Sequence, residues 1–355
     1  MGRRFYRIAA LGAALLLIGA STRAAFADGP STVEVSTAEQ LAAAMAKAQP
    51  GQTIHLADGT YHGEAFTTVS GTADQPITLK GSPNAVIVND FFVQPTTPCP
   101  SGHTAYGIWL NGASYWHLTG FTVAYSKKGI VLDHATGVRI SGVTIHDISE
   151  EGVHFRSSTT DSSIVGSVLY RTGLVQKGFG EGVYIGSAMG NWRCFGVDAD
   201  GVTPKNPDRS DRIRVVGNRF GPDIAAEHID IKEGTVDGEI TGNVFDGRGL
   251  SGANTADSWI DVKGSRYRLT GNFGTYAQTP GSVFANGYEI HEQFGLGYGC
   301  GNVFTGNFSV LGGVGGYAVL VTDQDSCASR GEPNVVDASN VVSGATIGLT
   351  NIPVG

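Results

Sequence analysis

The sequence predicts an all-β fold, a single-stranded right-handed parallel β-helix with an N-terminal capping helix. Three observations support this prediction. Short strand-like units recur along the chain, glycine is abundant with 52 residues in 355, and Gly-Asn pairs return at one place in the later units. Short apolar runs separated by glycine-rich turns are typical of all-β chains. A unit repeated every few tens of residues indicates a solenoid.

The N-terminus has the features of a secretion signal. Arg3, Arg4 and Arg7 precede an apolar run over residues 8–18, and Ala25-Phe26-Ala27 forms a small-x-small cleavage site. The apolar run is too short to span a membrane, so we expect no membrane insertion. Residues 1–27 are therefore predicted to be a signal peptide and residues 28–355 a secreted, extracellular β-helix domain.

The predicted mature chain is strongly acidic. The whole chain has 24 Lys and Arg against 32 Asp and Glu, and loss of residues 1–27 removes four arginines, which leaves a net charge of −12. Such a charge argues against nucleic acid as a partner, because phosphate binding needs a basic face. An anionic substrate would need a locally positive or metal-bearing site.

The four cysteines, Cys99, Cys194, Cys300 and Cys327, fit an oxidising compartment. Their spacing matches no zinc pattern, so we expect two disulfides. Three pairings are open. Cys300–Cys327 is favoured, because 27 residues correspond to about one turn of the repeat.

A helix is predicted to cap the solenoid. Thr37-Ala-Glu-Gln40 forms a capping box, the helix covers about residues 37–48, and Pro50-Gly51 ends it. Residues 53–56 then begin the first coil, and the coils extend over about 52–345. A solenoid end needs such a cover, because an open edge would pair with other chains.

Eight repeat units follow, separated by steps of 22 to 46 residues. They are residues 107–110, 129–132, 152–155, 182–185, 228–231, 259–262, 287–290 and 317–320. The longer steps imply loops inserted on one face. A second strand follows each of the first seven units. Asn218, Asn243, Asn272 and Asn307 follow glycines in the later coils and predict an internal ladder of turn asparagines.

Strand alternation assigns the faces of these units. The second and fourth residues point inward, whereas the third residue and the one two positions beyond it point outward. Stacked coils then give two outward columns. The first is Trp109, Val131, His154, Tyr184, Asp230, Asp261, Glu289 and Val319, and the second is Asn111, Asp133, Arg156, Gly186, Lys232, Lys263, His291 and Val321.

The middle of these columns is predicted to be a substrate groove. Charged and aromatic residues gather there, Glu151, Glu181 and Glu227 precede their units, and insertions 186–212 and 247–257 would wall the strip. The predicted substrate-binding residues are His154, Arg156, Tyr184, His228, Trp259 and Asp261. The alternative is a solvated surface in which these charges only pair across strands.

Such a set suits β-elimination of a uronic-acid polymer. The reaction needs a base next to the substrate carboxylate, a group that neutralises that carboxylate, and an acid for the leaving oxygen. Lysine can act as the base where its surroundings lower its proton affinity. Ca²⁺ held by carboxylates can neutralise the substrate, which would reconcile the acidic chain with an anionic polymer.

Residues 226–235, AEHIDIKEGT, followed by Gly242-Asn243, resemble the polysaccharide lyase family that contains chondroitinase B and β-helical alginate lyases, within the pectin-lyase-like superfamily. The resemblance implies a Ca²⁺ site with Glu227 as ligand and Lys232 as the base. It places Lys263 where the family has a cationic arginine, and Glu181 where it has an asparagine ligand. The family's second glutamate is absent, and Asp230 is our substitute for it, with Glu233 as an alternative.

The predicted function is therefore that of a secreted, monomeric polysaccharide lyase acting on pectate, alginate, glucuronan or a glycosaminoglycan. Lys232 and Lys263 are the predicted catalytic residues, and Glu181, Glu227 and Asp230 the predicted metal ligands. Calcium-dependent pectate lyases are similar in kind, but their clustered aspartate pattern is absent. Alternatives are a glycoside hydrolase that uses Asp230 and Asp261, a mannuronan epimerase, and a carbohydrate-binding or cell-surface β-helix without catalysis.

Overall fold

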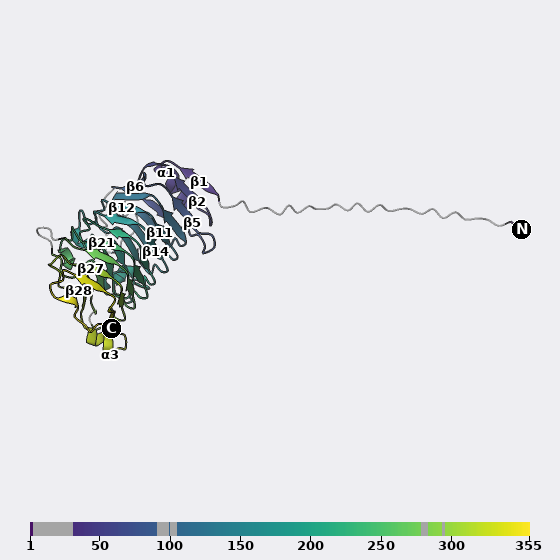
Figure 1. The fold of residues 1–355 in the computed structure, drawn as a ribbon. Helices are drawn as coiled ribbons and strands as arrows, with labels where there is room; N and C mark the ends of the chain where they lie inside the picture. The colour runs from purple at the N-terminus through teal and green to yellow at the C-terminus, as the bar shows by residue number, and fades with distance from the viewer. Residues whose placement is uncertain (3–30, 91–98, 100–104, 278–282, 293–294) are drawn as a thin grey trace.

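The computed structural model describes residues 1–2, 31–90, 99, 105–277, 283–292 and 295–355. The described residues form an elongated stack of coils, with α1 and β1 at one end and α3 with the C-terminus at the other (Figure 1). Almost all of the predicted signal peptide lies outside these residues. No helix in the described part of the chain is both long and apolar enough to cross a membrane.

Each coil contributes strands to three parallel sheets, which have eleven, ten and ten strands in the described residues. Sheet A runs β1 (Thr32–Val35), β2 (Thr53–Leu56), β5 (Ile77–Lys80), β8 (Trp116–Thr119), β11 (Arg139–Ser141), β14 (Ser163–Val165), β17 (Arg214–Val216), β20 (Glu239–Thr241), β23 (Arg268–Thr270), β26 (Val303–Thr305) and β29 (Val335–Val336).

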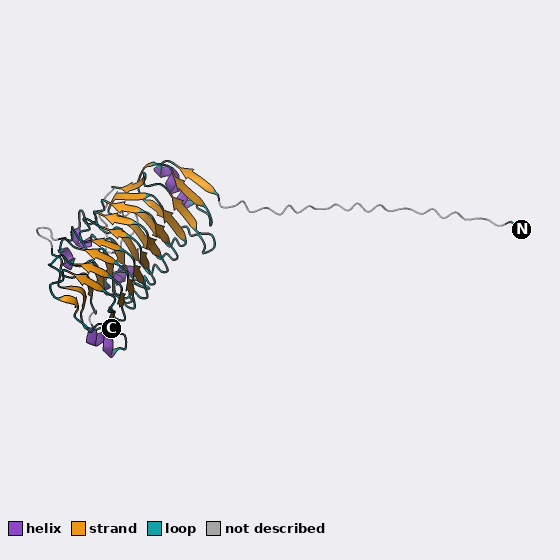
Figure 2. Cartoon of the chain, in the orientation of Figure 1, coloured by secondary structure: helices purple, strands orange, loops and turns teal. Residues whose placement is uncertain are grey.

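Sheet B runs β3 (Gly59–His62), β6 (Ala85–Asn89), β9 (Thr122–Ser126), β12 (Thr144–His146), β15 (Val168–Tyr170), β18 (Arg219–Phe220), β21 (Val244–Asp246), β24 (Phe273–Thr275), β27 (Phe308–Val310) and β30 (Val341–Ser343). Sheet C runs β4 (Ala65–Thr67), β7 (Tyr106–Asn111), β10 (Lys128–Asp133), β13 (Val153–Arg156), β16 (Val183–Ile185), β19 (Ile229–Ile231), β22 (Ile260–Val262), β25 (Tyr288–Ile290), β28 (Tyr317–Val321) and β31 (Gly348–Thr350). Strands dominate and helices are few (Figure 2). The predicted right-handed parallel β-helix is confirmed.

The capping helix α1 (Ala38–Ala46) covers the first coil and packs on β1 to β4. Thr37 is its N-cap, and the Thr37 hydroxyl accepts a hydrogen bond from the Gln40 amide at 3.3 Å. The Gln40 side chain does not return to the Thr37 amide as in a regular capping box. Its oxygen instead accepts from the Ser36 amide at 2.8 Å.

The stack is longer than predicted at both ends. β1 pairs with β2 before the helix begins, so the coils start at Thr32 and not near residue 52. β31 pairs with β28 beyond residue 345. The sequence hides both strands because each is short and lies outside the regular repeat.

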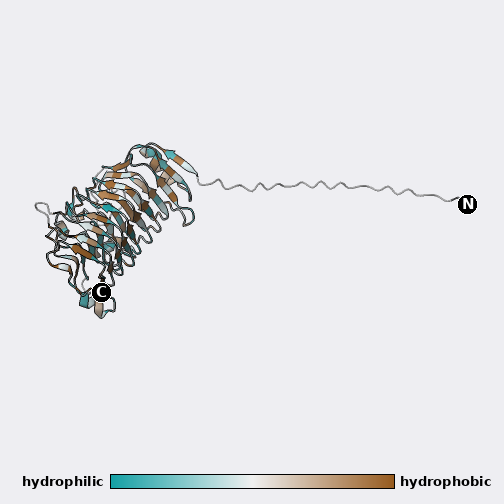
Figure 3. Cartoon of the chain, viewed as in Figure 1, coloured by the Kyte–Doolittle hydropathy of each residue, from teal (hydrophilic) through white to brown (hydrophobic). Residues whose placement is uncertain are grey.

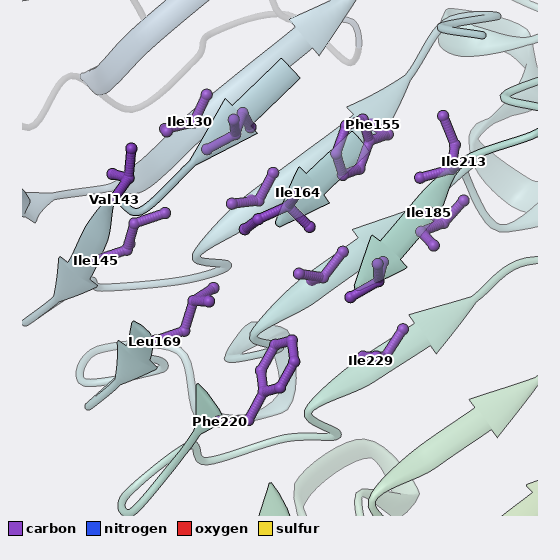
Figure 4. Packing of buried hydrophobic residues seen from close by; sticks show 14 of the residues in the cluster. Ile130, Val143, Ile145, Phe155, Ile164, Leu169, Ile185, Ile213, Phe220 and Ile229 are labelled. Carbon is purple, nitrogen blue, oxygen red and sulfur yellow. The ribbon is translucent and has the colours of Figure 1, made fainter. Parts of the chain in front are cut away.

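The interior is filled by apolar side chains stacked from coil to coil. In Figure 4, Ile130, Phe155, Ile185 and Ile229 follow one another on successive strands of sheet C, and all four are fully buried. Apolar and polar residues alternate along many strands (Figure 3). Burial of each such side chain contributes about 1.5–3 kcal/mol, which makes the stack the main source of stability.

The predicted asparagine ladder is confirmed. Each side-chain oxygen accepts hydrogen bonds from the backbone and side-chain amides of the asparagine one coil before it, at 2.9 to 3.0 Å from Asn218 to Asn307. The ladder continues to Asn340. Because these amides are buried, the ladder satisfies polar groups at the turn that water cannot reach.

Two disulfides join Cys99 to Cys194 and Cys300 to Cys327, which confirms the favoured second pair and decides between the three pairings. They indicate an extracellular or otherwise oxidising location. Three other helical turns and two short helices lie in the loops: η1 (Lys177–Phe179), η2 (Met189–Asn191), α2 (Trp192–Phe195), η3 (Ala253–Thr255) and α3 (Gln324–Ser329).

Candidate active site

The outward columns of sheet C form as predicted over the central coils. His154 pairs in register with Tyr184, Tyr184 with Asp230, and Asp230 with Asp261, which in turn faces Glu289. The last unit is the exception, because Val319 pairs with Tyr288 and Leu320 with Glu289. The predicted alignment there is wrong by one residue. The run Tyr317–Val321 is apolar apart from the tyrosine hydroxyl and so carries no alternation that fixes its register.

Three carboxylates meet at the centre of the strip. Ligand oxygens of Glu181, Glu227 and Asp230 lie within 4.8 Å of one another, and all three side chains are buried. One oxygen of Glu181 has no hydrogen-bond partner. Burial and the neighbouring acids raise the pKa of Glu181 well above its usual range, and burial together with Asp230 raises the pKa of Glu227 to about 8. Glu181 and Glu227 have no counterion, and buried acids of this kind are unfavourable unless they hold protons or a cation.

This donor set fits the predicted calcium site. Ca²⁺ takes carboxylate oxygens, and the unpartnered Glu181 oxygen offers one directly. Glu233, the alternative ligand, is not part of the cluster. Its carboxylate accepts a hydrogen bond from the Met189 amide at 2.5 Å, which fixes the start of η2.

Two lysines lie against these acids. The Lys232 ammonium is 2.5 Å from Asp230 and 5.1 Å from the centre of the Tyr184 ring. Lys263 contacts Asp261 and lies 3.6 Å from Asp230. Burial disfavours the ammonium of Lys232, but attraction by Asp230 and Asp261 outweighs it and raises the Lys232 pKa. The structure thus brings both predicted catalytic lysines to the acidic cluster.

Tyr184 and His154 form the next part of the strip. Their rings meet edge to face with centroids 4.5 Å apart. Burial and the charge of Asp230 raise the Tyr184 pKa, so its hydroxyl keeps its proton at neutral pH. His154 Nε2 lies 2.9 Å from the Gly186 carbonyl oxygen and Nδ1 lies 3.5 Å from Glu151, while burial lowers its pKa. Tyr184 is therefore available as a proton donor.

An ion network that sequence reasoning missed borders His154. Lys128 contacts Glu151 and lies 3.0 Å from Glu150, with all three side chains buried. The signal was present in the sequence, because Lys128 precedes its repeat unit just as Glu151, Glu181 and Glu227 precede theirs. Lys128 thereby neutralises the first glutamate of the column and leaves Glu181 and Glu227 without a cation.

Arg156 is locked in place by Asp133 on the neighbouring strand. Its Nε lies 2.6 Å from one Asp133 oxygen and Nη2 lies 3.0 Å from the other. Its guanidinium also lies over the Phe195 ring at 4.4 Å. Arg156 was predicted to bind substrate, and the structure shows that its guanidinium is already paired with a buried carboxylate.

His228 and Trp259 do not line the groove, and that prediction is wrong. Both are fully buried, His228 stacked on Phe245 and Trp259 packed against Phe284. Each stands at the corner before its strand, where strict alternation fails and Cβ points into the interior. The glycine at this corner in another coil shows the same direction, since a Cβ on Gly152 would lie 3.1 Å from the Leu169 side chain.

The groove holds a cavity of about 250 Å³ between the ion network and the inserted loops. Phe179, Asn191 and Phe195 line it, so insertion 186–212 walls the strip as predicted. Insertion 247–257 contributes differently. Its η3 packs on η1, and the Asn254 amide donates to the Gly178 carbonyl at 3.3 Å, which supports the loop that carries Phe179.

The far end of the strip is a separate carboxylate–histidine group. His291 lies 3.1 Å from Glu289 and 3.7 Å from Asp261. Burial and the acids Glu289 and Asp261 raise the pKa of Asp257 to about 6. This group connects to the lysines through Asp261 but adds no residue to the acidic cluster.

Comparison with known proteins places the chain in a family. Residues 21–178 match the model described as Pel9A-like, right handed beta helix region. No curated protein sequence matches the chain. The alginate lyase from Paenibacillus sp. str. FPU-7 is 36% identical with a TM-score of 0.76, over 90% of this chain and 98% of that chain.

Two more distant structures share the fold alone. Pectate lyase Pel9A is 15% identical with a TM-score of 0.64, over 92% of this chain and 79% of that chain. The GH136 lacto-N-biosidase from Eubacterium ramulus is 14% identical with a TM-score of 0.58, over 91% and 68%. At 36% identity over almost its full length, the chain belongs to the family of β-helical polysaccharide lyases that includes the Paenibacillus enzyme.

Proposed function

We propose that the protein is a secreted alginate lyase that cleaves its polymer by β-elimination at the strip around Lys232. The similarity to the Paenibacillus alginate lyase supports the substrate. The observation that carries the chemistry is the meeting of two lysines, a protonated tyrosine and an acidic cluster on and directly beside three successive strands, β16, β19 and β22. The two disulfides support export to an oxidising location.

Lys232 is the proposed base that removes the proton next to the substrate carboxylate. It has the most central position, in contact with Asp230 and beside Tyr184. Its raised pKa favours the ammonium in the resting protein, so Lys232 can act as base only after it has released this proton to solvent. Lys263, held by Asp261, is the proposed partner of the substrate carboxylate. A lysine gives this carboxylate a point charge, in contrast to the bidentate fork of an arginine.

Glu181, Glu227 and Asp230 are the proposed ligands of Ca²⁺, which would supply positive charge to neutralise the uronate carboxylate. Tyr184 is the proposed acid for the leaving oxygen, because its pKa is raised and its ring lies beside Lys232. Arg156 and His154 are proposed to bind the neighbouring sugar at the cavity. Phe179 and Phe195 provide apolar faces for its ring there.

A hydrolase using Asp230 and Asp261 is less well supported. Such an enzyme needs one carboxylic acid with a raised pKa as proton donor. Lys232 and Lys263 hold Asp230 as a carboxylate and lower its pKa in spite of burial, and Lys263 also pairs with Asp261. Both aspartates are thus ion-paired with the lysines. The β-helix itself does not decide, since a lacto-N-biosidase has the same fold.

The test is ultraviolet absorbance of the unsaturated product during incubation with alginate, polygalacturonate or glucuronan. We expect a rise with alginate, and Lys232→Ala should reduce its rate by about 10²–10⁴-fold. Lys47→Ala, an exposed lysine at the C-terminal end of α1, is the matched control and should leave the rate unchanged. Reducing ends released without absorbance would show hydrolysis, and unchanged activity of Lys232→Ala would exclude Lys232 as base.

A further inference from the structure

The outward face of sheet A carries an arginine on every second strand over its central part. Arg139 on β11, Arg214 on β17 and Arg268 on β23 occupy one register column, with Ser163 and Glu239 on the strands between them. All three arginines are exposed. Because neighbouring strands lie about 4.8 Å apart, the arginines repeat about every 10 Å along the stack.

Two of these arginines lack a counterion. Arg214 lies 2.7 Å from Glu239. Among the described residues, no carboxylate oxygen lies within 4.0 Å of a guanidinium nitrogen of Arg139 or Arg268. This is unusual on a chain with a formal net charge of −8, since most other arginines of the outer turns are paired, as Arg212 is with Asp161. Sheet A therefore presents uncompensated positive charge.

The same face is hollowed beside Arg268. A cavity of about 470 Å³ lies there, lined by Arg266 and Arg268 together with two acidic residues, Asp237 and Glu239. Of the two guanidinium groups in the lining of this cavity, that of Arg266 lies 2.7 Å from Asp237. This cavity shares no lining residue with the cavity at the sheet C strip. The column two residues further along these strands carries hydroxyl groups at Thr119, Ser141, Thr241, Thr270 and Thr305, with Val165 and Val216 between Ser141 and Thr241.

We propose that this face of sheet A is a second binding site for an extended polyuronate, separate from the groove on sheet C. Arginine forks bind carboxylates bidentately, and the hydroxyl column suits sugar hydroxyls. An extended polyuronate presents carboxylates along one edge at every second sugar, a repeat close to two strand spacings. The site would hold a polymer chain on the enzyme while the groove cleaves it. The choice of polyuronate rests on the proposed function.

The experiment measures retardation of the protein in native gels that contain sodium alginate, with dextran gels as the uncharged reference. All variants carry Lys232→Ala, so that no polymer is cleaved. Arg139→Ser with Arg268→Ser should weaken retardation at least about fivefold at low salt, and added NaCl should abolish the difference. The matched control, Arg219→Ser with Arg248→Ser, removes the same charge from exposed positions on and beside sheet B and should bind like its parent.

Activity gives a second readout in the protein with Lys232 intact. Arg139→Ser with Arg268→Ser should raise KM for long alginate while kcat and the cleavage of a uronate tetrasaccharide stay unchanged. Equal retardation of the two double variants, whether both weakened or both unchanged, would overturn the second site. If the protein cleaves alginate and the arginine substitutions have no effect, only the second site is refuted. If the protein neither cleaves nor binds alginate, the proposed function is refuted.

Discussion

Asp133 is the buried anion that fixes the cavity end of the strip. It receives hydrogen bonds from Arg156, from the Trp109 indole at 2.8 Å and from the Ser157 hydroxyl at 3.0 Å. Burial alone would raise its pKa, but these partners outweigh it and the Asp133 pKa is lowered. The aspartate thus compensates a guanidinium that is itself buried under Phe195.

Asp133→Asn should therefore be strongly destabilising. It leaves Arg156 buried without a counterion, which costs about 3–5 kcal/mol in the free energy of unfolding. Asp161→Asn breaks a half-exposed pair with Arg212 and should cost less than about 1 kcal/mol. Urea unfolding at neutral pH compares the two. A similar loss of unfolding free energy in both variants would contradict the burial of the Asp133–Arg156 pair.

The stability contributed by Asp133 should also depend on pH. Because its folded pKa is lowered, the contribution is complete above the unfolded pKa of about 4 and is lost as pH falls through the folded value. The difference between wild type and Asp133→Asn should thus stay constant from pH 8 to about pH 5 and shrink in more acidic solution. A stability difference that grows in acid would show that the folded protein raises the Asp133 pKa and does not lower it.

The acidic cluster predicts how calcium affects stability. Ca²⁺ at about 100 times its Kd should stabilise the wild type by about 2.7 kcal/mol, and a chelator should reverse this. Glu181→Gln or Glu227→Gln should lose most of the effect. In chelator, either variant should be at least as stable as the wild type, because it replaces a buried carboxyl group whose raised pKa makes it destabilising at neutral pH. Glu239→Gln on sheet A is the control, and thermal unfolding with and without Ca²⁺ is the measurement.

At the scale of the element, the asparagine ladder is the feature that the sequence predicts most fully. An asparagine at the same position of each coil is enough to predict the ladder, because each side-chain amide hydrogen-bonds the equivalent amide of the next coil. The strands of sheet C were placed equally well wherever polar residues alternate with apolar ones. The prediction failed at Tyr317–Val321, where both possible registers bury apolar side chains.

Asn272→Ala tests the ladder at its centre. The substitution leaves the amides of Asn243 and the carbonyl of Ile240 without partners in a buried turn. At about 1–3 kcal/mol for each unsatisfied group, we expect a loss of at least about 3 kcal/mol. Asn84→Ala, at an exposed turn, should change the free energy of unfolding by less than about 1 kcal/mol. Equal effects would show that the ladder adds nothing beyond an ordinary turn.

At the scale of the whole molecule, the two disulfides differ in the length of chain they close. Cys99–Cys194 spans 95 residues and Cys300–Cys327 spans 27. Loop entropy in the unfolded chain therefore predicts that replacing the first pair by serine costs about 1 kcal/mol more than replacing the second. Equilibrium unfolding of the two double variants measures this difference. A larger loss at Cys300–Cys327 would show that native packing decides, not loop length.

Local patterns in the sequence are enough to predict the solenoid, its cap, the asparagine ladder and the order of side chains along the central coils of the strip. These follow from local rules, since alternation within a strand and a recurring coil place each residue relative to its neighbours. The lysines and acids of the candidate site were found in this way. So was the pairing of Cys300 with Cys327.

Which of these groups are in contact and which are buried depends on how the coils pack in the folded molecule. Arg156 pairs with Asp133, and Lys128 pairs with Glu151. His228 and Trp259 are buried at a corner of the coil. Each outcome depends on the direction of a Cβ at a bend or on a partner one coil away. Loops of different length separate such partners in the sequence, so their contacts are set by packing in three dimensions and not by spacing along the chain.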